Sequence, residues 1–550
     1  MKTRLQRTFE PALISSVIIG LALANIWHVI TAKLSQPPGT VFVGITHYYE
    51  DYFYYLSQLT QGALGAWLTS NLYTTEPVPA TLLWWPNLVL GKAAALTGLP
   101  PWTVYDAAVF TASVASLALL YFGARMLYPD RRALRIGTFL MATLTTCYYL
   151  IQRKPDGTLF LNPYQYFYNY TESLNRLGGV FHLILQNILS LGFILAAGSL
   201  LTRLTAAKGT RDTVLKKAAQ TGLTAAVLAG INPLYIFVNG VSLGLTGFVQ
   251  MLIRPSRRLF TRLILSTVVI GVFVALPALI TVEAFNHPFY RYFRWWENQI
   301  IPTNIIIFLH SVGLPVLLIP LGIIPFLWNR SPLRILGIIW TLVPVILYFT
   351  PVPRLLEVPY FRLHQPPSYL FIGAVSAEGI YLVGRILTKL TRRQLTLPVF
   401  TILLLTYLAF QFPWIRQEVA ARRTNYALAS WLNYIPEDIY SGLMELKRYP
   451  RDRAVLAFNI VELVVPAVTG HTVYQGHHTL TPDYAGKIAI ATKFFNAGMS
   501  PAEAQNFLTG NNIGYVLWRV RDGTPPIIES YPFLTKRFEN SGIIIYILST

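Results

Sequence analysis

Charged residues are scarce in this 550-residue chain, and acidic residues are the scarcer of the two signs. Only 12% of the residues are Asp, Glu, Lys or Arg, against roughly 25% in soluble globular proteins. Hydrophobic residues make up 53% of the chain, and the mean hydropathy is +0.46. This balance excludes a cytosolic enzyme, a disordered protein and a fibre, and it indicates a polytopic membrane protein.

Cysteine is almost absent, because Cys147 is the only one and it lies within an apolar run. A lone cysteine excludes an intramolecular disulfide and a cysteine-based metal site. Three common catalytic patterns are missing as well: G-x-x-x-x-G-K-[ST], H-E-x-x-H and G-x-S-x-G. The first of these absences excludes ATP hydrolysis through a P-loop.

The shortage of acidic residues leaves 44 Lys and Arg against 24 Asp and Glu, a net charge of +20. Most of the basic residues lie in short loops between apolar runs, where membrane topology accounts for them. We therefore expect no nucleic-acid partner. With the N-terminus in the cytoplasm, every inner loop is basic, which predicts a multi-pass protein of the plasma (inner) membrane with an extracytoplasmic C-terminus.

Apolar runs of roughly 17–25 residues predict about eleven transmembrane helices. The pair of predicted spans between Ala218 and Met251 has the weakest signal, because Asn232-Pro233 and Asn239-Gly240 interrupt it. The predicted spans begin near Pro11, Val104, Leu134, Val180, Ala218, Val241, Leu263, Ile305, Ile335, Pro367 and Leu397.

Two domains are expected. Residues 1–415 form a transmembrane domain with a long first outer loop, about 35–103, which we expect to contain interfacial helices. Residues 416–550 change character: strand-like runs ("AVLAF", "YVLWRV", "IIIYIL") alternate with helix-like pieces. This alternation predicts a small extracytoplasmic α/β domain.

The first outer loop contains the strongest candidate site, "THYYEDYFYYLSQLTQGALGAW" (Thr46–Trp67). In a helix, Asp51, Tyr55 and Gln58 share one stripe, and Glu50 is adjacent to Asp51. A carboxylate in a partly dehydrated cleft suits a general base or a divalent-cation ligand, and Tyr55 and Gln58 would contact the substrate. The alternative is an acidic pair that only keeps a surface helix hydrated.

A second stretch, Pro351–Leu370, gathers Arg354, Arg362 and His364 in an outer loop. Arginine matches phosphate oxygens bidentately, so this cluster suits a lipid-linked phosphate. The alternative is that these side chains only anchor the loop at the membrane interface.

A third stretch, Asn286–Gln299, combines aromatic side chains with arginines and Glu297. This composition is common in sugar-binding sites, where Glu297 would bind the substrate, but the same residues also make an ordinary aromatic belt.

A fourth stretch, "TGHTVYQGHHTLTPDY", contains four residues of the kinds that bind zinc, namely His471, His477, His478 and Asp483. Their spacing matches no familiar metal signature, which favours a structured loop.

The order and sidedness of these segments resemble the polytopic GT-C glycosyltransferases. The resemblance rests on "YYEDYFYYLSQLTQGALGAW", "TTEPVPATLLWWPNLVLGKAAALTGLP", "NPLYIF", "LHQPPSYLFIGA" and "VPAVTGHTVYQGHHTLTPDY". It is stronger towards uncharacterised bacterial members than towards the protein-mannosylating or oligosaccharyltransferase branches.

The resemblance implies a GT-C-like fold and a polyprenyl-phosphate sugar donor. It also implies a glycan, lipid or protein as the acceptor, and contact with membrane lipids. The family's first-loop carboxylate, a base or a metal ligand, maps to Asp51, with Glu50 as the competing assignment. Either one could hold Mg²⁺ or Mn²⁺ if a divalent cation is used. Arg354, Arg362 and His364 would face the donor phosphate. The adjacency of Glu50 and Asp51 departs from many members, which leaves the role of each open.

The predicted function is transfer of a hexose or pentose to a cell-envelope acceptor on the outer face. Two alternatives remain. A non-enzymatic lipid-carrier flippase or transporter would need ionisable residues within its spans, and Glu378 is the best candidate. A lipid-linked glycan ligase would use similar cationic loops.

Overall fold

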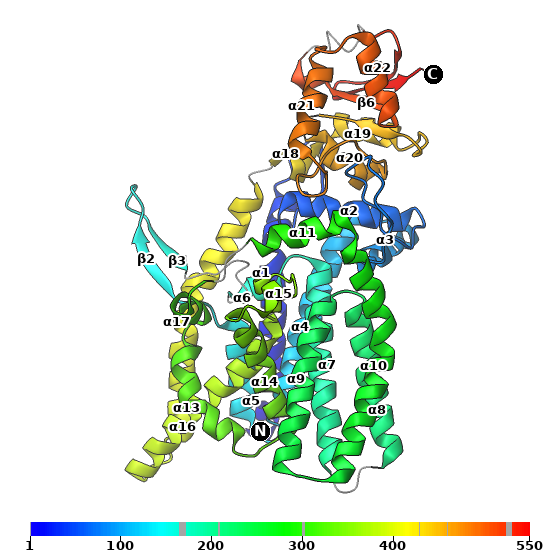
Figure 1. Ribbon diagram of the computed structural model, residues 1–550. Coiled ribbons are helices and arrows are strands. Elements are labelled where there is room, and N and C mark those ends of the chain that lie inside the picture. Colours follow the sequence, from blue (N-terminus) through cyan, green and yellow to red (C-terminus); the bar gives the residue numbers. More distant parts are fainter. Residues whose placement is uncertain are drawn as a thin grey trace. The chain divides into compact units, whose positions relative to one another are not determined.

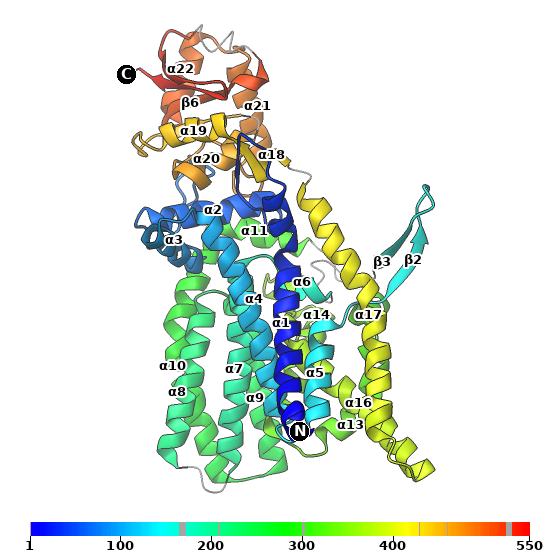
Figure 2. The same cartoon turned by 180° about the vertical axis from the view of Figure 1, so that it is seen from behind.

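The computed structural model describes residues 2–163, 172–206, 210–299, 303–427, 430–458, 460–523 and 531–549. The chain divides into two units (Figures 1 and 2). Unit 1 contains Met1–Asn25 and Phe110–Ala421. Unit 2 contains Ile26–Val109 and Arg422–Thr550, so it combines the loop predicted to be the first outer loop with the tail of the chain. The domain boundary at residue 415 stays a prediction.

Long apolar helices confirm the polytopic membrane architecture. Within the described residues, seven helices are long and apolar enough to span a membrane, or up to eight if a helix pair bent by 79° counts as one span. The bent pair is α12 (Ile305–Val312) and α13 (Pro315–Leu327). The seven are α1 (Lys2–Leu34), α4 (Pro101–Leu127), α7 (Phe181–Thr205), α9 (Pro233–Ile253), α10 (Arg257–Asn286), α16 (Tyr369–Thr391) and α17 (Thr396–Ala427).

All eleven predicted spans are helical, but four fall short of a simple span, so the count of eleven is not confirmed. Helices α5 (Arg132–Leu144) and α14 (Pro332–Tyr348) have only 13 and 17 residues. Helix α8 (Arg211–Ala229) has 19 residues, but its first two turns carry four charged side chains. The fourth is the bent pair α12–α13.

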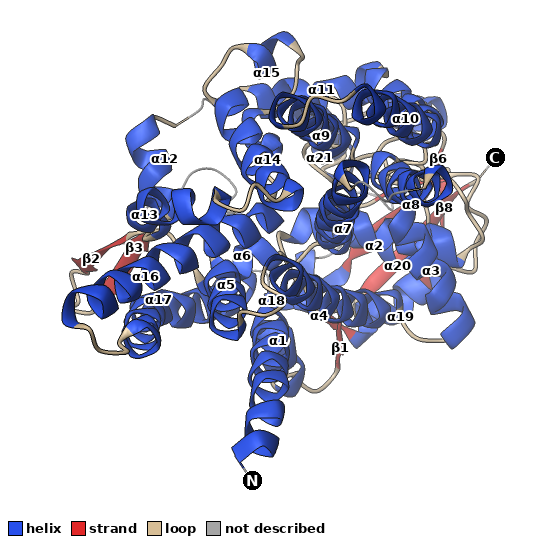
Figure 3. Cartoon of the chain, turned by 90° about the horizontal axis from the view of Figure 1, so that it is seen from below, coloured by secondary structure: helices blue, strands red, loops and turns tan. Residues whose placement is uncertain are grey.

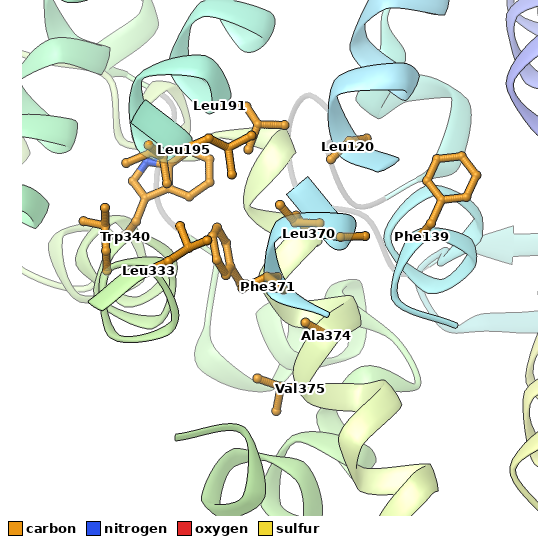
Figure 4. Packing of buried hydrophobic residues seen from close by; sticks show 14 of the residues in the cluster. Leu120, Phe139, Leu191, Leu195, Leu333, Trp340, Leu370, Phe371, Ala374 and Val375 are labelled. Carbon is orange, nitrogen blue, oxygen red and sulfur yellow. The ribbon is translucent and has the colours of Figure 1, made fainter. Parts of the chain in front are cut away.

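Unit 1 is held together by apolar side chains between its helices. Helix α13 packs on α16, α8 packs on α10, and α5 packs on α16. Figure 3 looks along several of these helices, and Figure 4 shows the core where α7, α14 and α16 meet. There the rings of Trp340 and Phe371 meet edge to face at 6.0 Å. The Trp340 indole donates a 2.8 Å hydrogen bond to Asn239 of α9, which satisfies the polar end of this buried ring.

Short elements connect the helices of unit 1. An antiparallel hairpin pairs β2 (Tyr149–Arg153) with β3 (Leu159–Pro163) (Figures 1 and 2). The other short elements are α6 (Ser173–Leu177), α11 (Pro288–Asn298), α15 (Val352–Leu355), η1 (Tyr360–Leu363) and η2 (Pro366–Ser368).

Unit 2 contains the predicted α/β fold. Its sheet has the order β5-β6-β8-β7, in which β5 and β6 are parallel and the other pairs antiparallel. The strands are β5 (Ala454–Leu456), β6 (Ile513–Arg519), β7 (Leu534–Glu539) and β8 (Ile543–Leu548). The helices of the tail are α18 (Ser430–Asn433), α19 (Glu437–Leu446), α20 (Val461–Thr469), α21 (Tyr484–Phe495) and α22 (Pro501–Gly510), and η3 (Val520–Asp522) follows β6.

The first outer loop is built into this same unit. Strand β1 (Thr40–Phe42) pairs antiparallel with β4 (Tyr434–Pro436). Two helices, α2 (Tyr49–Ala63) and α3 (Trp85–Thr97), form where helices were expected, and α2 packs on both α3 and α20. The loop and the tail therefore share one core.

Glycine allows α2 and α3 to approach closely. A Cβ on Gly91 of α3 would lie 2.0 Å from the Leu59 carbonyl oxygen, and a Cβ on Gly62 of α2 would lie 2.2 Å from the Leu88 carbonyl oxygen. Both contacts are with backbone, which cannot move aside cheaply. The position of α2 therefore depends on these two glycines.

Candidate functional site

Helix α2 presents the acidic pair at its N-terminal end. Glu50 and Asp51 lie in its first turn, where negative charge is favourable to the helix dipole. The next residues, Tyr52 and Phe53, are fully buried and fix the helix in the unit 2 core. The two acids differ in exposure: the side chain of Glu50 is 14% exposed and that of Asp51 is 48% exposed. Asp51 is therefore the carboxylate that solvent or a substrate can reach.

The other two predicted residues of the α2 stripe have structural partners. Gln58 is fully buried and accepts a 2.7 Å hydrogen bond from Asn87 of α3. The Tyr55 ring is partly buried and lies 5.5 Å from the His47 ring. The Gln58 contact ties α2 to α3, while the substrate-binding roles of Gln58 and Tyr55 stay predictions.

Two adjacent histidines of the tail meet the acidic pair. His478 hydrogen-bonds Glu50 through Nδ1. His477 lies between the two carboxylates: its Nδ1 is 3.8 Å from Glu50 Oε2, and its Nε2 is 3.5 Å from Asp51 Oδ1. The His477 side chain is only 2% exposed, and its ring stacks on His478 at 5.4 Å between centroids. The site thus joins residues that are more than 400 positions apart in the chain.

The loop that contains His477 and His478, called the histidine loop below, is held in place by hydrogen bonds to the predicted first outer loop. Thr481 donates a 2.7 Å bond to the Tyr73 carbonyl, and its hydroxyl accepts bonds from the backbone nitrogens of Gly476 and His477. Asn71 donates a 2.8 Å bond to the Leu480 carbonyl. The positions of His477 and His478 are therefore set by the same loop that carries the acids.

The electrostatics keep Glu50 charged. Burial alone would raise the pKa of Glu50, but the hydrogen bond from His478 and the nearby charges of both histidines hold the pKa below its usual value. The same hydrogen bond raises the pKa of His478, against the lowering effect of burial. Glu50 and His478 therefore form a charge-assisted pair.

The remaining tail residues of the fourth stretch serve the fold. His471 is buried and hydrogen-bonds Thr469 and the Pro450 carbonyl, and burial lowers its pKa to about 4. Asp483 caps α21 through the Gly486 backbone nitrogen. Of the four, only His477 and His478 turn towards the acidic pair.

Unit 1 brings two of the predicted stretches together. Arg362 donates a 2.5 Å hydrogen bond to Glu297, and both side chains are mostly buried. Arg354 is exposed on α15. His364 is partly buried and stacks on Phe308 at 5.4 Å, and burial lowers its pKa to about 4. Since a neutral imidazole carries no charge to a phosphate, the positive charge of this loop comes from its two arginines.

Glu378, the residue that best supports the transporter alternative, has a cationic partner. Its Oε1 lies 3.7 Å from Arg334 Nη1, and both side chains are buried. Arg334 also donates hydrogen bonds to the carbonyls of Phe326 and Leu127. This ion pair inside the helix bundle explains how a carboxylate can lie in the middle of a span, and the explanation requires no role in proton coupling.

The donor atoms around Glu50 fit a metal ion. One ligand atom each from Glu50, His477 and His478 lies within 4.8 Å of the others. His477 Nε2 is a buried ring nitrogen that makes no hydrogen bond within the part of the chain that the structure describes. A carboxylate and two imidazoles are ordinary ligands of a transition metal.

No family profile and no curated protein sequence matches the chain. Solved structures do match. The apo oligosaccharyltransferase of Archaeoglobus fulgidus is 13% identical with a TM-score of 0.54, over 98% of this chain and 75% of that one. ArnT from Cupriavidus metallidurans, bound to undecaprenyl phosphate, is 11% identical with a TM-score of 0.50, over 98% of both chains. This chain has the GT-C fold.

A third structure with the GT-C fold is a variant of the arabinofuranosyltransferase AftD from Mycobacteria. It is 14% identical with a TM-score of 0.51, and the match covers 98% of this chain but 41% of AftD. The fold expected from the sequence resemblance is thus confirmed. The three solved proteins named above, which share this fold, are membrane glycosyltransferases.

Proposed function

We propose that this protein is a membrane glycosyltransferase that moves a hexose or pentose from a polyprenyl-phosphate donor to a cell-envelope acceptor. The fold supports the donor class, because ArnT is solved with undecaprenyl phosphate and the archaeal oligosaccharyltransferase with a dolichol-phosphate. The observation that carries the proposal is Asp51, a half-exposed carboxylate fixed at the start of α2 and backed by a buried histidine.

In the proposed reaction Asp51 is the general base. It takes the proton from an acceptor hydroxyl as the oxygen attacks the anomeric carbon, and the bond from that carbon to the phosphate oxygen breaks. The polyprenyl phosphate leaves with the electron pair of that bond. Arg354 and Arg362 would stabilise the charge that develops on the leaving phosphate. His477 acts as a positioning residue, because its Nε2 faces Asp51.

Glu50, His477 and His478 would hold a divalent cation, should the protein use one. Such an ion would supply positive charge near the base. The acceptor is a glycan, a lipid or a protein, and the reaction takes place on the outer face of the plasma membrane, with the N-terminus in the cytoplasm. These assignments follow the basic inner loops and the position of Asp51 in the first outer loop.

A reconstitution experiment tests this function against its rivals. The full chain in proteoliposomes is given polyprenyl-phosphate donors labelled in the sugar (mannose, glucose or arabinofuranose), together with membrane extract as the source of acceptor. We expect one donor to yield free polyprenyl phosphate and labelled product. Donor that crosses the bilayer without any product would favour a flippase. Product formed only from oligosaccharide-bearing carriers would favour a glycan ligase.

A further inference from the structure

Two ion pairs in unit 1 hold α11 against residues 351–368, called the arginine loop below. Arg362 Nη2 of the loop donates a 2.5 Å hydrogen bond to Glu297 Oε1 of α11, and Arg362 Nε donates a 3.3 Å bond to Glu297 Oε2. The second pair has the opposite polarity, because Arg291 of α11 lies 3.2 Å from Glu357 of the loop. Helix α11 is therefore a strap that is fixed to the arginine loop at two points.

The two ion pairs differ in their exposure to solvent. The side chains of Arg362 and Glu297 are 28% and 19% exposed. Those of Arg291 and Glu357 are 62% and 51% exposed. Water competes with an exposed ion pair, whereas a partly buried arginine that donates two hydrogen bonds to one carboxylate is held more firmly. The pair of Glu297 and Arg362 is thus the stronger contact of the strap.

The arginine loop is also anchored on the helix bundle, independently of α11. The Gln365 side chain is 2% exposed and accepts hydrogen bonds from Ser190 of α7 and, at 3.1 Å, from the Trp340 indole of α14. The Tyr235 hydroxyl of α9 donates a 3.2 Å bond to the His364 carbonyl. Because the bundle fixes the loop from this side, the carboxylate of Glu297 is available for another role.

A carboxylate and a phosphate bind arginine through the same fork of N–H groups. Glu297 occupies two of these groups, Nε and Nη2 of Arg362. We propose that Glu297 is the counter-ion of Arg362 while no donor is bound, and that the phosphate of the polyprenyl-phosphate donor displaces it. The displacement breaks the stronger contact of the strap, so donor binding loosens α11 from the arginine loop. This inference rests on the proposed function, because it takes Arg362 as a donor-binding residue.

The exchange also gives the site a preference for anionic lipids. A neutral head group that displaced Glu297 would leave the charge of Arg362 without a counter-ion at a partly buried position, which is unfavourable. A phosphate brings the negative charge that replaces the carboxylate. Glu297 therefore acts against uncharged polyprenols and lowers the affinity for the phosphate by competing with it.

Binding of farnesyl phosphate, a short polyprenyl phosphate, is measured by calorimetry on the full chain in detergent. Glu297→Gln should bind it about 3- to 10-fold more tightly than the wild type, because the amide removes the competing charge. Glu357→Gln is the matched control in the exposed pair and should bind as the wild type does. Farnesol, which lacks the phosphate, should not distinguish Glu297→Gln from the wild type.

The sign of the change is decisive, because a carboxylate that only positioned Arg362 would give weaker binding when it is removed. Unchanged or weaker binding by a folded Glu297→Gln protein would overturn the inference. If that variant fails to fold, Glu297→Asp takes its place: the shorter acid loosens the contact and should bind farnesyl phosphate more tightly than the wild type, and equal or weaker binding would overturn the inference.

Arg362→Gln separates this inference from the proposed function. We expect it to lose most of the affinity for farnesyl phosphate. If it does so while Glu297→Gln shows no gain, the counter-ion role fails and the donor-binding role of Arg362 stands. If Arg362→Gln binds farnesyl phosphate as the wild type does, Arg362 is not a donor-binding residue, and that part of the proposed function fails together with the inference.

Discussion

Two adjacent carboxylates of α2 experience different surroundings, and this difference is the basis of their proposed roles. Glu50 is mostly buried against His478, while Asp51 is about half exposed. A base must reach the hydroxyl that it deprotonates, whereas a ligand must be held by its neighbours. The exposure of Asp51 and the pairing of Glu50 therefore favour Asp51 as base.

A buried acid near the histidine loop gives a stability prediction. Glu462, in the first turn of α20, is 7% exposed, and burial raises its pKa to about 7. Its Oε2 has no hydrogen-bond partner among the described residues. Because the folded chain holds this proton more tightly than the unfolded chain, stability falls as pH rises from about 4.5 to about 7.

Replacing Glu462 with Gln removes that penalty. Thermal unfolding should show Glu462→Gln more stable than the wild type at pH 8.5, by up to about 3 kcal/mol, and similar to it at pH 4.5. Glu437→Gln, at an exposed position of α19, serves as the control and should show no such pH dependence. A stability difference that does not change with pH would contradict the account.

At the scale of elements, the site depends on how closely α2 and α3 pack. Gly91→Ala places a methyl group 2.0 Å from the Leu59 carbonyl oxygen, which must push the helices apart. Alanine favours a helix by up to about 1 kcal/mol over glycine, but overpacking costs about 1–3 kcal/mol. We expect a lower melting temperature and lower transfer activity, because α2 carries Asp51.

Gly510→Ala, at the end of α22, is the matched control because nothing lies within 4 Å of its added Cβ. Its melting temperature should equal or exceed that of the wild type. A Gly91→Ala protein as stable and as active as the wild type would show that the close approach of α2 and α3 is unimportant.

Elements with a strong local signal could be predicted from the sequence. Strands β5, β6 and β8 fall on the apolar runs that predicted them. Strand β7 was not predicted, because "LTKRFE" is charged and mostly exposed. It lies at one edge of the sheet, where charge prevents pairing with other chains.

The contacts of the candidate site could be predicted from the sequence only in part. Periodicity and charge located Glu50 and Asp51 on a helix, but His478 lies 428 residues further along the chain. Only the packing of α2 on α20 and the hydrogen bonds of Thr481 bring that histidine to Glu50. No local pattern contains this information.

At the scale of the whole molecule, the charge of the loops predicts the orientation in the membrane. Cys147 is buried and unpaired, so a Cys147→Ser background allows single cysteines to be placed at exposed positions. In spheroplasts of a bacterial expression host, Gln505→Cys in α22 should react with a membrane-impermeant maleimide. Ser256→Cys, between α9 and α10, should react only after permeabilisation. The reverse pattern of labelling would invert the topology and place the tail in the cytoplasm.

Sugar transfer by Asp51→Asn in proteoliposomes tests the central claim most directly. The account predicts that this variant loses transfer from the polyprenyl-phosphate donor by about 10²-fold or more, as expected when a general base is removed. Its melting temperature and its yield from membranes should match those of the wild type, because Asn has nearly the same shape and the position is half exposed. Transfer at the wild-type rate by a folded Asp51→Asn protein would contradict the account.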